Sequence, residues 1–284
     1  MTEGSSSIDA LPSVSPWHVA WTLCWREIVR FFRQRNRVIG AVGQPILFWL
    51  LFGAGLHQSF HLAPDGASGM SFLEYYFPGT LILILLFTAI FATISIIEDR
   101  RQGFLQSVLV APIPRWSMVL GKVLGGTLIA VAQGVFFLFL SLVLQVDLGI
   151  AHCLALVALL FVISFGLTSL GFVLAWRMES TQGFHAIMNL LLMPMWLLSG
   201  AFFPVPPAQS GAATSQLVLH WCMRINPVTY GVAGVRRLLY SPEQLANLWT
   251  PGLTTCWSVT LGFAIVTFAA CWKLAGKHTA GDLL

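Results

Sequence analysis

Six long apolar runs that lack charge in their middle are the feature that most constrains this chain. They cover residues 38–56, 77–97, 119–146, 153–176, 184–203 and 253–272. A helix needs about 20 apolar residues to cross the hydrocarbon core of a membrane, so each run is long enough to span it. Charged residues make up only 9% of the chain, against about a quarter in soluble domains. The sequence therefore predicts an all-α integral membrane protein with six transmembrane helices over residues 38–272, and it excludes a soluble enzyme.

Most basic residues fall on one side of the predicted spans. Cytoplasmic segments of membrane proteins retain Lys and Arg. If the amino terminus lies inside, the inner segments hold 12 of the 15 basic residues, and the other three, Arg224, Arg236 and Arg237, share one outer loop. Both termini are therefore predicted to be cytoplasmic, with a disordered tail over residues 1–14 and a second tail over 273–284. Because the basic residues flank apolar runs and form no stripe, we expect membrane lipid as an anionic partner and no nucleic acid.

The segment before the first span, residues 15–37, predicts an amphipathic interfacial helix. Ser15 followed by Pro16 is a favourable helix start. Tryptophans and other apolar residues then recur at helical spacing, while Arg26, Arg30 and Arg33 lie on another face. Such a helix lies at the membrane surface. The sequence leaves open whether it only anchors the chain to anionic lipid or whether its polar face also docks a cytoplasmic partner.

A short cytoplasmic helix is predicted between the second and third spans, at about residues 99–111. Acidic residues stand at its front, and Pro112 and Pro114 end it. One of its sides carries an apolar ridge of Phe104, Leu105, Val108 and Leu109. Because this helix is too short to cross a membrane, we expect the ridge to enter a groove on another protein. The alternative is a helix that lies flat among the lipid headgroups.

The outer segment of residues 204–252 predicts two short helices that are split at Asn226 and Pro227. Neither half is long enough to span, and backbone breaks at membrane depth are tolerated only inside protein or beside a water-filled cavity. We therefore interpret the segment as a re-entrant or outer-interface hairpin. Such a hairpin could close the outer end of a pathway or simply cap the bundle, and the pattern is compatible with both.

The chemistry that the spans lack is also informative. Ion-coupled carriers need ionisable groups at depth, at a cost of roughly 2.5–3.5 kcal/mol each, and none lies in the middle of the six runs. No Walker motif, catalytic motif or metal-ligand cluster is present, so no catalytic, cofactor or metal site is predicted. No C-x-x-C pair occurs either, and the pairing of Cys222 with Cys256 is left open. Energy is therefore expected from another polypeptide, and the best candidates to contact a substrate are the neutral residues Gln133, Asn189 and Phe203.

Several longer stretches together carry a resemblance to a known family. They are QPILFWLLFGAGL, YYFPGTLILILLF, EDRRQGFLQSVLVAPIPRWSMVLGK, LLSGAFFP and INPVTYGVAGVRRLL. With these stretches, the chain from about residue 21 to 272 resembles permease subunits of type-2 ATP-binding-cassette exporters. That group includes daunorubicin-type drug exporters and nodulation-factor exporters.

The resemblance implies a homodimer in a bacterial cytoplasmic (inner) membrane, with each permease docked on a separate ATPase subunit that binds ATP and Mg. It implies that residues 17–34 form the family's connecting helix and that the Asn226–Pro227 break belongs to its outer re-entrant element. The short helix at 99–111 would be the coupling helix that enters the ATPase. Its expected coupling residues are Glu98, Arg101, Gly103, Phe104, Leu105, Val108, Leu109 and Pro112.

The resemblance does not name a cargo. Charge-free spans favour an amphipathic, drug-like or lipid-like substrate that leaves the cytoplasm or inner leaflet. A polysaccharide or lipid-linked glycan is the alternative within the family, since 11 tryptophans are available to line a pathway. A partner-independent pore or ion-coupled carrier is the alternative of another class.

Overall fold

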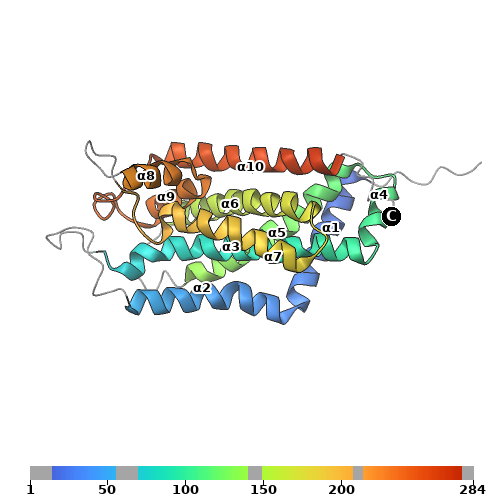
Figure 1. Cartoon of the computed structure of the whole chain (residues 1–284), viewed down its shortest axis with the longest axis horizontal. Helices are drawn as coiled ribbons and strands as arrows, with labels where there is room; N and C mark the ends of the chain where they lie inside the picture. Colours follow the sequence, from blue (N-terminus) through green and yellow to red (C-terminus); the bar gives the residue numbers. More distant parts are fainter. Residues whose placement is uncertain (1–14, 56–69, 140–148, 207–213, 277–284) are drawn as a thin grey trace, which may run out of the picture.

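The computed structural model describes residues 15–55, 70–139, 149–206 and 214–276, and over these residues the chain is helical and contains no strand (Figure 1). The helices, in chain order, are α1 (Pro16–Arg33), α2 (Arg35–Gly55), α3 (Phe72–Arg101), α4 (Phe104–Val110), α5 (Arg115–Leu138), α6 (Ile150–Trp176), α7 (Thr181–Trp196), the π-helical turn η2 (Leu197–Ala201), α8 (Thr214–Ile225), α9 (Pro227–Leu239) and α10 (Leu253–Gly276).

Helix α3 is the centre of the bundle. It is apolar on all sides and buried along almost its whole length, as expected of a helix surrounded by others. Helices α2, α5, α6 and α7 pack around it, α10 lies along α6, and α1 crosses α5 (Figure 1). Two tryptophans fasten the flanking helices to α3. Trp49 of α2 donates to the carbonyl of Leu73 at 3.1 Å, and Trp196 of α7 donates to that of Gly79 at 2.8 Å.

Five helices of the described chain are long and apolar enough to cross a membrane: α3, α5, α6, α7 with η2, and α10. The predicted first span lies in α2, whose apolar stretch, Val38–Gly53, is shorter. The predicted all-α membrane fold is confirmed.

Two predicted helices, at residues 15–37 and at about residues 99–111, have different bounds in the structure. The helix expected over residues 15–37 is two helices, because the chain leaves helical geometry at Gln34 and α2 begins at Arg35. The coupling helix expected at about 99–111 is only α4, because α3 continues through Arg101. Gly103 then makes the turn with φ +74°, a left-handed conformation that glycine adopts at little cost.

The carboxyl-terminal boundary also differs. Residues 273–276, predicted as part of a tail, continue α10. The rest of that tail and the tail predicted over residues 1–14 lie outside the described residues, as do residues 140–146 of the predicted third span and residues 207–213 of the outer segment.

The outer segment contains the two short helices α8 and α9, which meet at Asn226 and Pro227. Asn226 caps α9, since its side-chain oxygen accepts from the amide of Val228 at 3.1 Å. Its amide nitrogen donates to the carbonyl of Met195 at 2.5 Å, which ties the break to α7. Cys222 and Cys256 are not joined, with Cys222 exposed and Cys256 buried.

The bundle has two distinct ends. We call the end that holds α4 and the last turns of α3, α6 and α10 the α4 end, and the opposite end holds α8 and α9 (Figure 1). The α4 end holds basic residues that are predicted to be cytoplasmic, such as Arg26 of α1, Arg115 at the start of α5 and Lys273 in the last turn of α10. Arg224, Arg236 and Arg237 belong to α8 and α9 at the other end. This separation fits the positive-inside prediction, and the direction in a membrane stays a prediction.

Candidate functional site

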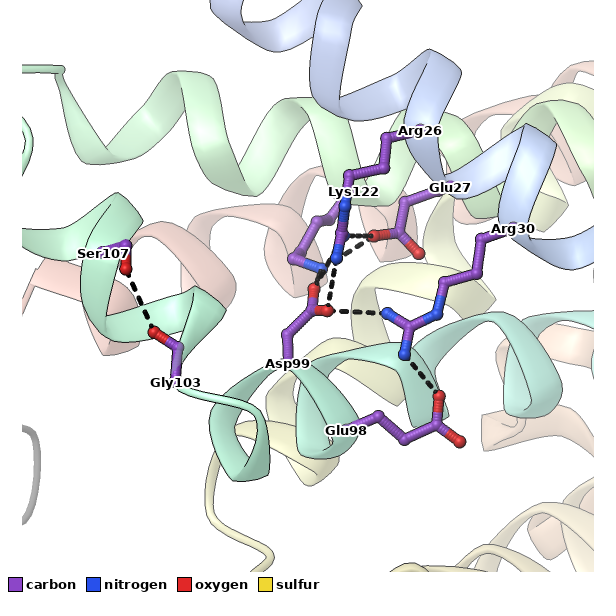
Figure 2. Close-up of polar contacts among 8 residues, drawn as sticks. All are labelled: Arg26, Glu27, Arg30, Glu98, Asp99, Gly103, Ser107 and Lys122. Atoms are coloured by element: carbon purple, nitrogen blue, oxygen red, sulfur yellow. Dashed lines mark hydrogen bonds and ion pairs between the residues drawn. The ribbon is translucent and has the colours of Figure 1, made fainter.

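Six charged side chains meet at the α4 end, where α1 crosses α3 and α5 (Figure 2). Three are cations and three are anions, so their formal charges cancel. We call this group the charge cluster. Its members are Arg26, Glu27 and Arg30 of α1, Glu98 and Asp99 of α3, and Lys122 of α5.

Asp99 is the centre of the charge cluster. Its side chain is 0% exposed and contacts all three cations. Arg26 donates two hydrogen bonds to the carboxylate, at 2.8 and 3.0 Å, in the bidentate geometry that makes arginine–carboxylate pairs strong. Arg30 donates at 2.6 Å and Lys122 at 2.5 Å. One buried carboxylate therefore joins three helices.

The other two acids complete the charge balance. Lys122 also donates to Glu27 at 2.8 Å, and Arg30 also donates to Glu98 at 2.7 Å. Buried ions are tolerated only when they are paired and hydrogen-bonded, and this arrangement satisfies both conditions. The hydrogen bonds that Arg26 donates to Asp99 raise the pKa of Arg26 above its ordinary value, so this guanidinium stays charged.

Two glycines of α5 allow α1 to come this close. A Cβ on Gly121 would lie 2.5 Å from the carbonyl oxygen of Ala20, and one on Gly125 would lie 2.7 Å from Cβ of Glu27. No larger residue fits without moving α1. Small residues four positions apart are typical of close helix packing. The structure shows α1 as the packing partner, which brings Glu27 within reach of Lys122.

The charge cluster is also linked to α4. The guanidinium of Arg26 lies 3.8 Å from the ring centre of Phe104, a cation–π contact. Leu105 is only 2% exposed, and Val108 and Leu109 pack against the same core. The apolar ridge of α4 was expected to enter a groove on another protein, but in the single chain it packs against the chain's own bundle. The open side of α4 instead carries Gln106, Ser107 and Val110, and Val110 is 77% exposed.

The other residues predicted for the connecting helix or for coupling surround this site without joining the charge cluster. Arg33 and Arg101 are exposed at the ends of α1 and α3, Gly103 forms the turn before α4, and Pro112 follows α4. Arg26 and Arg30, expected on an open polar face, turn inward. Neither Asp99 nor Glu27 was expected from the sequence to belong to a functional site. Glu27 could have been found as the single acidic residue inside an arginine-rich helix.

The three predicted substrate residues do not come together. Gln133 is buried between α5 and α3, where it accepts a hydrogen bond from Thr88, and its amide nitrogen has no hydrogen-bond partner among the described residues. Phe203 is partly buried just after η2, and Asn189 is exposed on α7. The structure adds Gln44, which is exposed on α2. Two neutral amide side chains therefore stand on the outer faces of two helices that both pack against α3.

At the opposite end, a buried arginine anchors α9 to α3 and η2. The guanidinium of Arg236 lies 4.1 Å from the ring centre of Tyr75. It donates to the carbonyl of Gly200 at 2.7 Å, and the Tyr75 hydroxyl donates to the same oxygen at 2.8 Å. Gly200 has φ +75°, so this turn also favours glycine. From the sequence, Arg236 was expected only as one of three basic residues in the outer loop.

Comparisons with known proteins agree with this architecture. The family described as "ABC-2 type transporter" matches residues 18–240. A transport permease named ycf38 from Cyanophora paradoxa is 26% identical over 243 residues, which cover 84% of this chain and 79% of the relative. The inner membrane transport permease YadH of Escherichia coli K12 is 24% identical over 267 residues, covering 91% and 94%. Nodulation protein J of Rhizobium leguminosarum bv. viciae is 26% identical over 221 residues, covering 74% and 82%.

Proposed function

The chain belongs to the ABC-2 type transporter family, and from this premise we propose that it is the membrane subunit of an ATP-driven exporter whose ATPase is a separate polypeptide. Its family and relatives make it a transport permease, and permeases of this family normally work with an ATPase partner. We also propose where the ATPase docks, that a second copy of the chain takes part, in which direction transport runs and what kind of cargo is moved. The observation that carries it is the open side of α4, which is fixed to the charge cluster behind it.

The contacts of α4 support a mechanical route from an ATPase into the spans. A partner that pushes on Gln106, Ser107 and Val110 would move a helix whose opposite side is packed against the bundle. Phe104 passes that movement to Arg26, and Asp99 joins Arg26 to α3 and α5. Because Glu27, Asp99 and Lys122 are buried and every member of the charge cluster is paired, α1, α3 and α5 should move as one unit at this end. ATP-driven closure on the predicted cytoplasmic side would then reach the spans.

Val110→Asp tests the docking side of α4. We expect the variant to fold normally, because Val110 is 77% exposed, and to bind its ATPase at least about tenfold more weakly, because a charge would be desolvated in an apolar contact. The measurement is the amount of Walker-motif subunit that co-purifies with the full chain, together with ATP hydrolysis by the complex. Ile150→Asp is the matched control, since Ile150 is 82% exposed at the opposite end of the bundle. Equal binding by both variants would remove α4 from the docking site.

The exposed amides support a second copy of the chain. Gln44 and Asn189 stand among exposed apolar residues of α2 and α7, and a polar side chain at membrane depth normally faces protein or a water-filled cavity. We therefore propose that these faces of two identical chains oppose each other and enclose the pathway. A cavity lined by neutral faces suits an amphipathic, drug-like or lipid-like cargo that enters from the predicted cytoplasmic side and leaves outward.

Leu190→Asp tests this interface. Leu190 is 78% exposed on α7 next to Asn189, so the change should not disturb the single chain. Native mass spectrometry of the wild-type complex is expected to give two permeases with two ATPases, whereas Leu190→Asp weakens the pairing by at least about tenfold, because two carboxylates would face each other in an apolar contact. Val266→Asp, at a 68% exposed position on α10, controls for the cost of a charge on an apolar surface. A one-to-one wild-type mass would contradict the proposal.

A further inference from the structure

A second feature of the α4 end is a groove between the last turns of α6 and α10. It has a cavity volume of about 430 Å³. Apolar side chains of both helices form most of its lining, Leu174 and Leu274 among them, and Arg177 and Lys273 add one cation from each helix. No acidic residue lines it. We call it the basic groove. It is an apolar hollow that presents two positive charges at the end of two membrane-spanning helices.

The two cations of the basic groove are not used by the fold. Both side chains are exposed, and neither has a hydrogen bond or ion pair in the described part of the chain. Lysine and arginine near a helix end often serve its free carbonyls, but other arginines already do so here. Arg100 donates to the carbonyls of Trp176, the last residue of α6, and of Met178 just after it, and Arg115 donates to that of Ala275 in α10 at 2.6 Å. Arg177 and Lys273 are therefore left to bind something outside the described chain.

The position of the basic groove narrows the chemistry of that ligand. Helices α6 and α10 are both long and apolar enough to span a membrane, and the two cations come at or just beyond their apolar stretches. Such a position lies at the level of the lipid headgroups. Basic pockets between transmembrane helices on the cytoplasmic side are typical sites for anionic headgroups.

We propose that the basic groove is a binding site for one anionic phospholipid of the leaflet at the α4 end. The phosphate would lie between Arg177 and Lys273, and the upper part of an acyl chain would lie against Leu174 and Leu274. The absence of an acidic lining residue disfavours a zwitterionic lipid, because an ammonium headgroup would find no carboxylate there. This inference requires that α6 and α10 span a membrane, and it is independent of the proposed ATPase coupling.

Lipid retention measured by native mass spectrometry tests the site. The full chain, purified with its ATPase, is released from vesicles that contain phosphatidylglycerol and phosphatidylcholine in equal amounts. We expect the wild type to retain phosphatidylglycerol in preference. Arg177→Gln and Lys273→Gln should each lower that retention about fivefold, because each cation near the surface contributes separately to the binding of anionic lipid. Both positions are exposed, so the fold should not depend on them.

Arg35→Gln is the matched control for each single variant. It removes one exposed charge near the same end of the bundle, and Arg35 does not line the basic groove. Retention by the control at the wild-type level would support a specific site. Three results would overturn it: equal retention of both lipids, an equal loss in the control, or retention only after the ATPase is removed. Equal retention of both lipids would indicate an ordinary apolar surface, and an equal loss in the control would indicate a general attraction of basic residues to anionic lipid. Retention only after removal of the ATPase would indicate that the basic groove contacts the ATPase.

Discussion

Asp99→Leu is expected to lower the stability of the folded chain by about 3–5 kcal/mol, the range measured when one partner of a buried ion pair is removed. Asp99 is 0% exposed and is shared by Arg26, Arg30 and Lys122. Without its carboxylate, the charge cluster would hold three cations and two acids, which leaves one positive charge uncompensated at a buried position. The measurement is the thermal unfolding midpoint of the purified chain in detergent, together with its yield in the membrane. A variant that fails to accumulate is also an expected result.

A paired change separates lost charge balance from lost volume. Asp99→Leu/Lys122→Met removes one acid and one cation, so Arg26 and Arg30 remain opposite Glu27 and Glu98. Replacing a buried ion pair by apolar residues of similar volume is often neutral or stabilising, and we therefore expect most of the lost stability to return. Glu98→Gln is the mild control, because the Arg30–Glu98 pair is partly exposed and such pairs contribute about 0–1 kcal/mol. An Asp99→Leu chain that melts like the wild type would show that the charge cluster does not stabilise the fold.

The sequence predicts the spans well because one strong physical requirement determines them. Apolar runs without charge can only be buried in protein or lipid, and the observed helices contain the predicted runs of α3, α6 and α10. Boundaries that depend on weaker effects were wrong. The charged residues after Ile97 were read as the front of a new helix, yet they form the last turn of α3 because Gly103, not the charge, makes the turn.

The candidate site was only partly predictable for a different reason. Helical spacing places Arg26 and Arg30 on one face of α1, but the spacing does not reveal what that face meets. Their partner, Asp99, is about 70 residues away and becomes a neighbour only after α1 has crossed α5 at Gly121 and Gly125. The ridge of α4 illustrates the same limit. Its apolar side could be covered by a groove on another protein or by the chain's own bundle, and in the single chain it packs against the bundle.

Uphill export that depends entirely on ATP and a second subunit is the other large expected effect. In the described spans the buried charged residues are Asp99 and Lys122, and both are paired within the charge cluster at the α4 end. A carrier driven by an ion gradient needs an ionisable group that can take up and release its ion within the membrane. The fixed ion pairs of the charge cluster do not meet that need, and we therefore expect that an ion gradient will not drive transport by the isolated chain.

Reconstitution tests this central claim most directly. Vesicles are prepared with the chain alone or with its co-purified ATPase, and accumulation of fluorescent amphipathic dyes and labelled phospholipids is followed with ATP, without nucleotide, and under imposed proton and sodium gradients. The account predicts accumulation only when both subunits and ATP are present. Accumulation against a concentration difference by the chain alone, driven by either gradient without nucleotide, would contradict it.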